Sequence, residues 1–200
     1  MFAIGSLLFA AATLPGFPAW AGAGPANLMC FVGSWFFTTA AWMQLVSSSP
    51  SFAAERSAAA IQFAGTLLFN LSTGAAVWAH AVTAERRYVW APDLTGSAAF
   101  LLSGVLGVVA VSTTAGLFAV RSRDWLAGAI NLIGCVAFGV SAVAAFVRVS
   151  GITADERLAN LGTFLGALCF LAAAVMVMPR KLTRNAVTPA RGSAGPPESP

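Results

Sequence analysis

Charged side chains are absent from six long apolar stretches, and this absence restricts the possible folds of the chain more than any other feature. The chain is 58% hydrophobic and 9% charged, whereas soluble domains are about 25% charged. A helix needs roughly 20 apolar residues to cross a bilayer. The sequence therefore predicts an all-α polytopic membrane protein with six transmembrane helices, over Met1 to Leu14, Ala26 to Val46, Ala58 to His80, Ser97 to Val120, Trp125 to Val147 and Leu158 to Met178.

The first of these stretches is too short to cross a membrane as it stands. Met1 to Leu14 would rise about 21 Å as a helix, against a hydrocarbon core of about 30 Å. Either Ala19 to Ala23 extend this span beyond the prolines, or the true start of the chain lies upstream. A secretory signal peptide is an alternative, because Ala19-Trp20-Ala21 resembles a cleavage site. The missing basic n-region argues against that alternative, and so does a sequence pattern that this stretch shares with later spans.

Five of the six stretches share one pattern near their middle, Gly-(Ser/Thr/Cys/Ala)-x-x-Phe. A glycine and a phenylalanine four residues later lie on one face of a helix. Small residues on such faces let membrane helices approach closely. We expect helix packing, and no further role, at Gly5, Phe9, Gly33, Phe37, Gly65, Phe69, Gly134, Phe138, Gly162, Gly166 and Phe170.

The pattern also predicts how the spans are paired. Asn27 to Phe37 in the second span matches Asn160 to Phe170 in the sixth at Asn, Leu, Gly and both Phe positions. We therefore expect hairpins at residues 1–46 and 121–178 that are copies of one unit. A central hairpin at 47–120 is expected to be diverged or unrelated. A basic, disordered cytoplasmic tail is expected at 179–200, where Pro, Gly, Ser and basic residues replace the apolar pattern.

Polar residues inside the expected spans offer no reactive constellation. No acid, base, activated nucleophile or metal-ligand set occurs there, so we expect no enzymatic activity, catalytic residue, metal or cofactor. His80, the single histidine, is expected at the membrane interface. Asn70, Asn131 and Asn160 either bond between helices or line a path for a neutral solute. A structural or interaction role is the leading hypothesis, and a pore or carrier for a neutral small solute is the alternative.

The connecting segments indicate orientation and helix starts. Most of the 11 Lys and Arg residues follow even-numbered spans or lie in the tail, which predicts that both termini are cytoplasmic. We expect Asp124 to cap the fifth span and Thr153 to Glu156 to form a capping box at the sixth. The expected partners are the lipid bilayer and, through the glycine faces, further copies of this chain or other membrane proteins, but not nucleic acid.

The Gly-Ser-x-x-Phe pairs resemble those of the YrhK-like family, small bacterial membrane domains made of two helices. The closest stretch is Ile4 to Phe9 with Phe31 to Phe37, within residues 1–46. Residues 130–178 repeat this pattern, with Cys135 and Ala167 at the two positions where the first hairpin has serine. The Arg-Pro that ends the family's second helix is absent after Phe37. The resemblance implies a multi-pass protein of the bacterial plasma membrane and no established activity.

Overall fold

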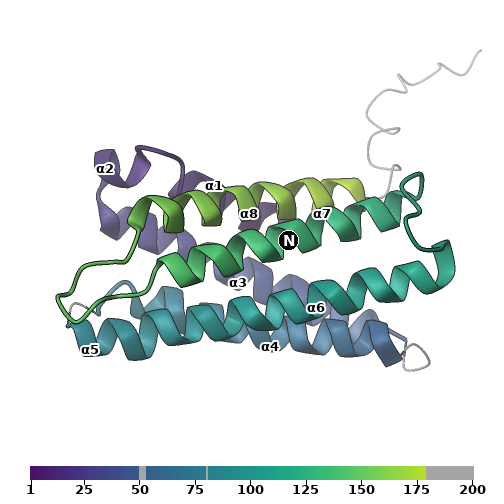
Figure 1. The fold of residues 1–200 in the computed structure, drawn as a ribbon, viewed down its shortest axis with the longest axis horizontal. Coiled ribbons are helices and arrows are strands. Elements are labelled where there is room, and N and C mark those ends of the chain that lie inside the picture. The colour runs from purple at the N-terminus through teal and green to yellow at the C-terminus, as the bar shows by residue number, and fades with distance from the viewer. Residues whose placement is uncertain (50–52, 80, 179–200) are drawn as a thin grey trace, which may run out of the picture.

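Helices joined by short connections make up the described chain, as the apolar stretches predict. The computed structural model describes residues 1–49, 53–79 and 81–178. Its elements are α1 (Phe2–Ala12), α2 (Phe17–Ala21), α3 (Ala23–Ser47), α4 (Ala53–Ala75), α5 (Val82–Ala84), the π-helical η1 (Glu85–Trp90), α6 (Ala91–Ala115), α7 (Arg123–Ala144) and α8 (Glu156–Met176) (Figure 1). These residues contain no β-strand, only an isolated bridge between Val147 and Thr153. The all-α prediction is confirmed.

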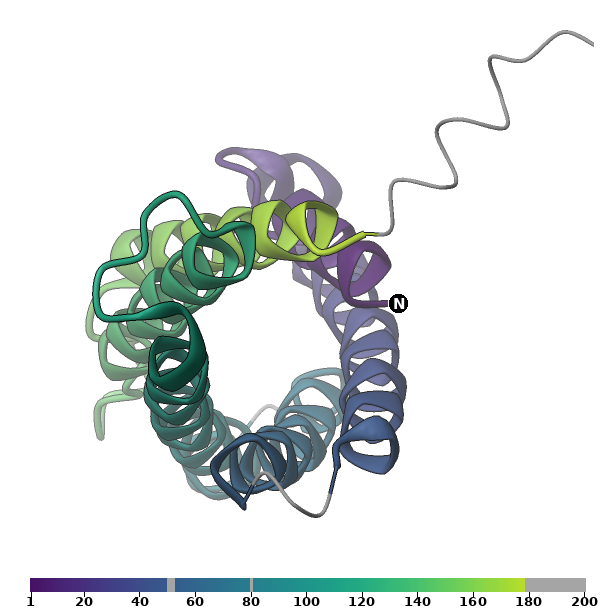
Figure 2. The ribbon, with the colours of Figure 1, turned by 90° about the vertical axis from the view of Figure 1, so that its right-hand side faces the viewer.

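Six of the described helices form a closed ring. Along the chain α1 packs on α3, α3 on α4, α4 on α6, α6 on α7 and α7 on α8. The ring closes because α8 also packs on α1 (Figure 2). Consecutive members form three hairpins, α1/α3, α4/α6 and α7/α8, so that the connections alternate between the two ends of the ring. The start of α1 and the end of α8 consequently lie at the same end.

Four helical segments within the described residues are long and apolar enough to cross a membrane: Ala23–Ser47, Val82–Ala115, Arg123–Ala144 and Glu156–Met176. The other two members of the ring fall short for different reasons. α1 is apolar but has only 11 residues. α4 has 23 residues but is less apolar than the other long helices, because it contains Gln62, Asn70 and several Ser and Thr residues. The structure thus supports a membrane protein with four candidate spans, two fewer than the sequence predicts.

The first helix is not extended by the residues beyond the prolines. α1 ends at Ala12, and the backbone turns at Gly16, whose φ is 91°. Pro18 then lies in the first turn of the separate helix α2, because a proline fits the first turn of a helix but interrupts its interior. The expected extension, Ala19 to Ala23, is therefore divided between α2 and the start of α3.

The fourth predicted span, Ser97 to Val120, is displaced along the sequence. The helical segment begins at Val82 and ends at Ala115, where Gly116 has a φ of 94°. A π-helical turn precedes Pro92, in the first turn of α6, so the helix runs on through the charged residues 85–87 without a break. This shift brings Gly96, Ser97 and Phe100, a sixth copy of the repeated pattern, well inside a long helix.

Both predicted helix caps are wrong. Ser122 caps α7, and its Oγ accepts a hydrogen bond from the Trp125 N–H at 3.4 Å, so Asp124 instead lies inside the first turn. Asp155 caps α8, and its Oδ1 accepts from the Leu158 N–H at 2.9 Å. Thr153 is held in the bridge to Val147 before the helix begins. His80 and the predicted tail at 179–200 lie outside the described residues.

Candidate functional site

In every hairpin of the ring, the motif phenylalanine of each helix lies against the motif glycine of the other. A Cβ atom on Gly134 would lie 2.6 Å from the Phe170 ring, and one on Gly166 would lie 2.7 Å from the Phe138 ring. Side chains cannot approach so closely, so only glycine fits there. The corresponding distances are 3.1 and 2.9 Å for Gly5–Phe37 and Gly33–Phe9, and 3.1 and 2.8 Å for Gly65–Phe100 and Gly96–Phe69.

The central hairpin, which was expected to be diverged or unrelated, has the same packing geometry as the outer two. Its Gly65 and Gly96 make the same reciprocal contacts as the glycines of the outer hairpins. Gly162 adds a further close approach in the third hairpin, because its Cβ would lie 2.9 Å from the Ala137 carbonyl oxygen on α7. The structure therefore brings every predicted packing residue to a helix–helix contact within its own hairpin.

Six phenylalanine rings meet inside the ring of helices and form what we call the aromatic core. Each is at most 5% exposed. Neighbouring ring centroids lie 4.9 to 6.3 Å apart, and the contacts run in a closed circuit. Such separations are typical of attractive aromatic pairs. The aromatic core fills the axis of the bundle with apolar side chains, and consists of Phe9, Phe37, Phe69, Phe100, Phe138 and Phe170.

The second position of the repeated pattern is buried in every copy, and in two copies it forms a hydrogen bond to the next hairpin. The residue there is at most 1% exposed in all six copies, which are Ser6, Ser34, Thr66, Ser97, Cys135 and Ala167. Ser34 accepts a hydrogen bond from the Thr73 hydroxyl at 3.1 Å, which links α3 to α4. Ser97 donates to the Phe138 carbonyl at 3.5 Å, which links α6 to α7. Small side chains are required here because two hairpins approach at this point.

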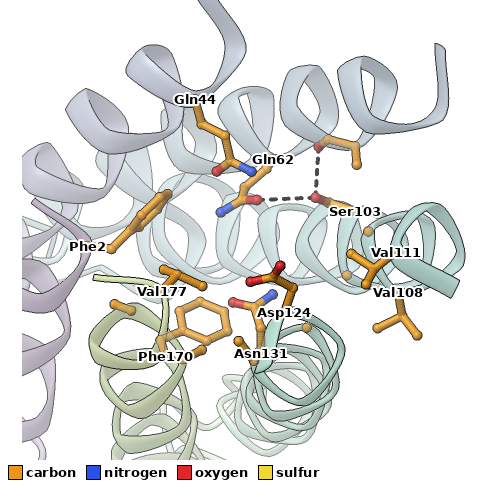
Figure 3. A pocket seen from close by; sticks show the side chains of 17 residues that line it. Phe2, Gln44, Gln62, Ser103, Val108, Val111, Asp124, Asn131, Phe170 and Val177 are labelled. Carbon is orange, nitrogen blue, oxygen red and sulfur yellow. Dashed lines mark hydrogen bonds between the residues drawn. The ribbon is translucent and has the colours of Figure 1, made fainter. Parts of the chain in front are cut away.

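A cavity of about 290 Å³ lies on one side of the aromatic core, at the end of the bundle where α1, α4 and α7 begin. All six helices of the ring contribute to its wall. Phe2 and Phe170 supply aromatic surface. The polar lining comes from Gln44, Gln62, Ser103, Asp124 and Asn131 (Figure 3). The remaining lining is largely Ala, Gly and Val.

Some of these polar groups are already engaged within the protein. The Ser103 hydroxyl donates to the Ala58 carbonyl at 2.8 Å and lies 3.4 Å from Gln62 Oε1. The Asn131 amide approaches Cys135 Sγ at 3.8 Å. Among the described residues, the side chains of Gln44 and Asp124 have no hydrogen-bond or ion-pair partner. Both residues are exposed at the open end of the cavity, so the amide and the carboxylate remain accessible to a bound molecule.

The three asparagines proposed as a polar lining do not converge. Asn131 lines the cavity, and Gln44 and Gln62 join it there. Asn70 follows Phe69 directly, and its Oδ1 is buried without a partner in the described structure. Asn160 lies near the start of α8, whereas the cavity is lined by the last turns of that helix. Sequence position alone could not separate them, because the depth of each amide depends on where its helix begins and ends.

The half of the bundle beyond the aromatic core is held by hydrogen bonds between helices. The Asn27 amide donates to the Ala76 carbonyl at 2.9 Å, and the Ser141 hydroxyl donates to the Ala159 carbonyl at 2.6 Å. The indole N–H of Trp90 reaches the Ala142 carbonyl at 3.0 Å. The polar groups on this side therefore serve mainly to connect helices.

The helices of the ring also contain carboxylates that the apolar pattern alone places in loops. Asp93 lies in α6, two turns before Phe100 and so on the same helix face. Asp124 lies in the first turn of α7. Both fall inside segments long and apolar enough to span a membrane. The expectation that the spans are free of carboxylates is therefore corrected, because α6 and α7 both begin earlier than predicted.

Metal ligands do not gather in the described part of the chain: no group of three His, Cys, Asp or Glu side chains is placed to hold an ion. Comparison with protein-family models, with curated proteins and with solved structures finds no match. A role for this chain therefore rests on the geometry of the bundle and on the lining of its cavity.

Proposed function

We propose that this chain is an integral membrane protein that crosses the bilayer six times. The ring supports the two additional spans, because α4 lies between α3 and α6 and α1 lies between α3 and α8. Both helices also carry exposed apolar side chains, including Leu67 and Leu71 on α4 and Ile4 and Leu7 on α1. Outward-facing leucines and isoleucines are what lipid-exposed helices require. The short α1 would span with local thinning of the bilayer or with flanking segments at the interface.

We place the protein in the bacterial cytoplasmic membrane with both termini inside. The YrhK-like resemblance supports the bacterial assignment. The orientation is supported by Arg56, Arg121 and Arg123, which lie at the same end of the ring as the cavity and as the N-terminus. The cavity would then open toward the cytoplasm.

Paired fusions of alkaline phosphatase and green fluorescent protein test the number of spans. Fusions at Ser49 and at Ala79, on either side of α4, are expected to report opposite faces of the membrane. Fusions before α1 and at Gly16 are expected to do the same. Reporters on the same face at either pair would reduce the number of spans and contradict the proposal.

The proposed role is structural or interactive, without enzymatic activity or conduction. The aromatic core carries this proposal, because closely packed rings occupy the axis along which a solute would have to pass. Interaction with further copies or with other membrane proteins follows as an expectation that crosslinking in membranes can test. In proteoliposomes, we expect no uptake of urea, glycerol or alkali-metal ions above that of empty liposomes. Uptake that depends on the protein would overturn a non-conducting role.

A carrier for a small neutral solute is the second candidate. The cavity favours it, since amide and hydroxyl groups approach the aromatic core from one end. A carrier would have to open the aromatic core during transport. Crosslinking pairs of cysteines introduced across the cavity mouth is expected to block uptake by a carrier and to leave a structural role unaffected.

A further inference from the structure

The cavity combines one unpaired carboxylate with oriented amides and an aromatic wall. Figure 3 shows Asp124 and Asn131 of α7 pointing toward Gln44 and Gln62 of α3 and α4 across the open space. Among the described residues that line the cavity, Asp124 alone carries a formal charge. Amide carbonyl oxygens can accept further hydrogen bonds in the same space. The ring of Phe170, which lies beside Asn131 in Figure 3, also lines the cavity and is fixed in the aromatic core.

This lining selects among classes of ligand. An anion would face the Asp124 carboxylate, and a neutral solute would leave that charge unpaired. A divalent metal ion would find a single carboxylate, whereas Mg²⁺ and Ca²⁺ sites require more charged oxygen ligands or several waters. An ammonium or guanidinium group can instead bond the carboxylate and the amide oxygens together. Its apolar stem can pack on an aromatic ring.

We propose that the cavity binds a small organic monocation, such as an alkylammonium or alkylguanidinium ion. The charged nitrogen bonds to Asp124 and to the amide oxygens of Gln44 and Gln62, and the alkyl stem lies against Phe2 and Phe170. A volume of about 290 Å³ lies at the lower end of the range for pockets that hold drug-sized ligands, so an ammonium or guanidinium group with a short alkyl stem fits inside it. The proposed binding site does not depend on which face of the membrane the cavity opens toward.

The test uses the full-length protein in nanodiscs and four probes of similar length. Butylammonium and butylguanidinium are the expected ligands, and 1-butanol and butyrate are the neutral and anionic controls. Calorimetric titration and the shift in melting temperature measure binding. We expect both cations to bind and to raise the melting temperature, and neither control to do so. Equal binding of 1-butanol, or no binding of either cation, would overturn the proposal.

Three variants separate the site from general charge effects. Asp124→Asn keeps the shape but removes the charge, and is expected to weaken cation binding about tenfold or more. Asp155→Asn is the matched control at the opposite end of the bundle, where Asn also caps helices, and should bind as the native protein does. Gly107→Leu fills the cavity at a point where an added Cβ meets no atom within 4 Å, and should abolish binding. Native affinity in Asp124→Asn or in Gly107→Leu would refute the assignment.

Discussion

Gly134→Ala tests the reciprocal Gly–Phe contact where it is tightest. The added Cβ would lie 2.6 Å from Phe170 Cδ1, 2.8 Å from Cε1 and 3.0 Å from the Cβ of Cys169. To reach ordinary contact the ring would have to move from 2.6 Å to at least 3.4 Å, a retreat of about 0.8 Å. It cannot retreat freely, because Phe170 also contacts the rings of Phe37, Phe100 and Phe138.

Two opposing terms determine how much Gly134→Ala changes the free energy of unfolding. Forcing one carbon into a packed core costs about 1–3 kcal/mol. Replacing a helical glycine by alanine returns about 0.5–1 kcal/mol through backbone entropy. Gly139→Ala is the matched control, since it lies on the same helix and its Cβ would meet nothing within 4 Å. Gly139→Ala gains the backbone entropy without the steric cost. The Gly134→Ala protein should therefore be less stable than the Gly139→Ala protein by about 1–3 kcal/mol.

Unfolding in mixed dodecyl maltoside and SDS micelles, followed by circular dichroism, measures the difference in the free energy of unfolding. We expect Gly134→Ala to unfold at a lower SDS fraction than the native protein. Gly139→Ala is expected to unfold at the same fraction or a higher one. If the two alanine variants unfold together, the Phe170 ring does not require a glycine at this position of the repeated pattern, and the steric explanation of the pattern is wrong.

Three further substitutions test other parts of the bundle in the same unfolding assay. Phe138→Ala should cost about 3–5 kcal/mol, because it leaves a void in the aromatic core; a loss below that of a surface Leu→Ala change would contradict the packing. Ser141→Ala removes hydrogen bonds to Ala159 and Thr163 and should cost about 1.2 kcal/mol, since such bonds in membrane proteins contribute on average about 0.6 kcal/mol each. An unchanged unfolding midpoint would show that those hydrogen bonds do not contribute to the free energy of unfolding. Asp155→Ala should cost about 1 kcal/mol through the lost cap, and faster amide exchange in the first turn of α8 would locate the effect there.

The local pattern predicted that the chain is helical, and it predicted the packing face of five of the six ring helices. The spacing of Gly33 and Phe37 places both on one side of a helix whatever the neighbouring helix is. The copy in α6 was missed because the predicted span began at Ser97, one residue after Gly96, and the pattern was sought near the middle of each span. The helical segment instead begins at Val82, before the charged residues 85–87 and Pro92. A π-helical turn carries the chain through them. Such a turn depends on packing between helices, which a single sequence does not display.

The candidate site was less predictable because it depends on relations between helices. Gln62 and Asn131 lie in different hairpins, and no short-range pattern joins them. Asp124 was expected to act as a helix cap, and its position in the cavity wall depends on Ser122 taking that role. The cavity itself exists because the ring closes, and closure requires the contact between α1 and α8 at opposite ends of the chain.

The repeated pattern relates the two ends of the bundle and shows where they differ. The residue three positions before each motif glycine lies one turn away, on the same face of its helix. At the cavity end these residues are Phe2, Gln62 and Asn131, and all three line the cavity. At the opposite end the equivalent residues are Cys30, Asp93 and Thr163. The contacts between Gly and Phe are therefore common to both ends, whereas the side chains one turn farther out are not. Packing thus constrains the aromatic core, and the adjoining layer can vary in chemistry without altering the fold.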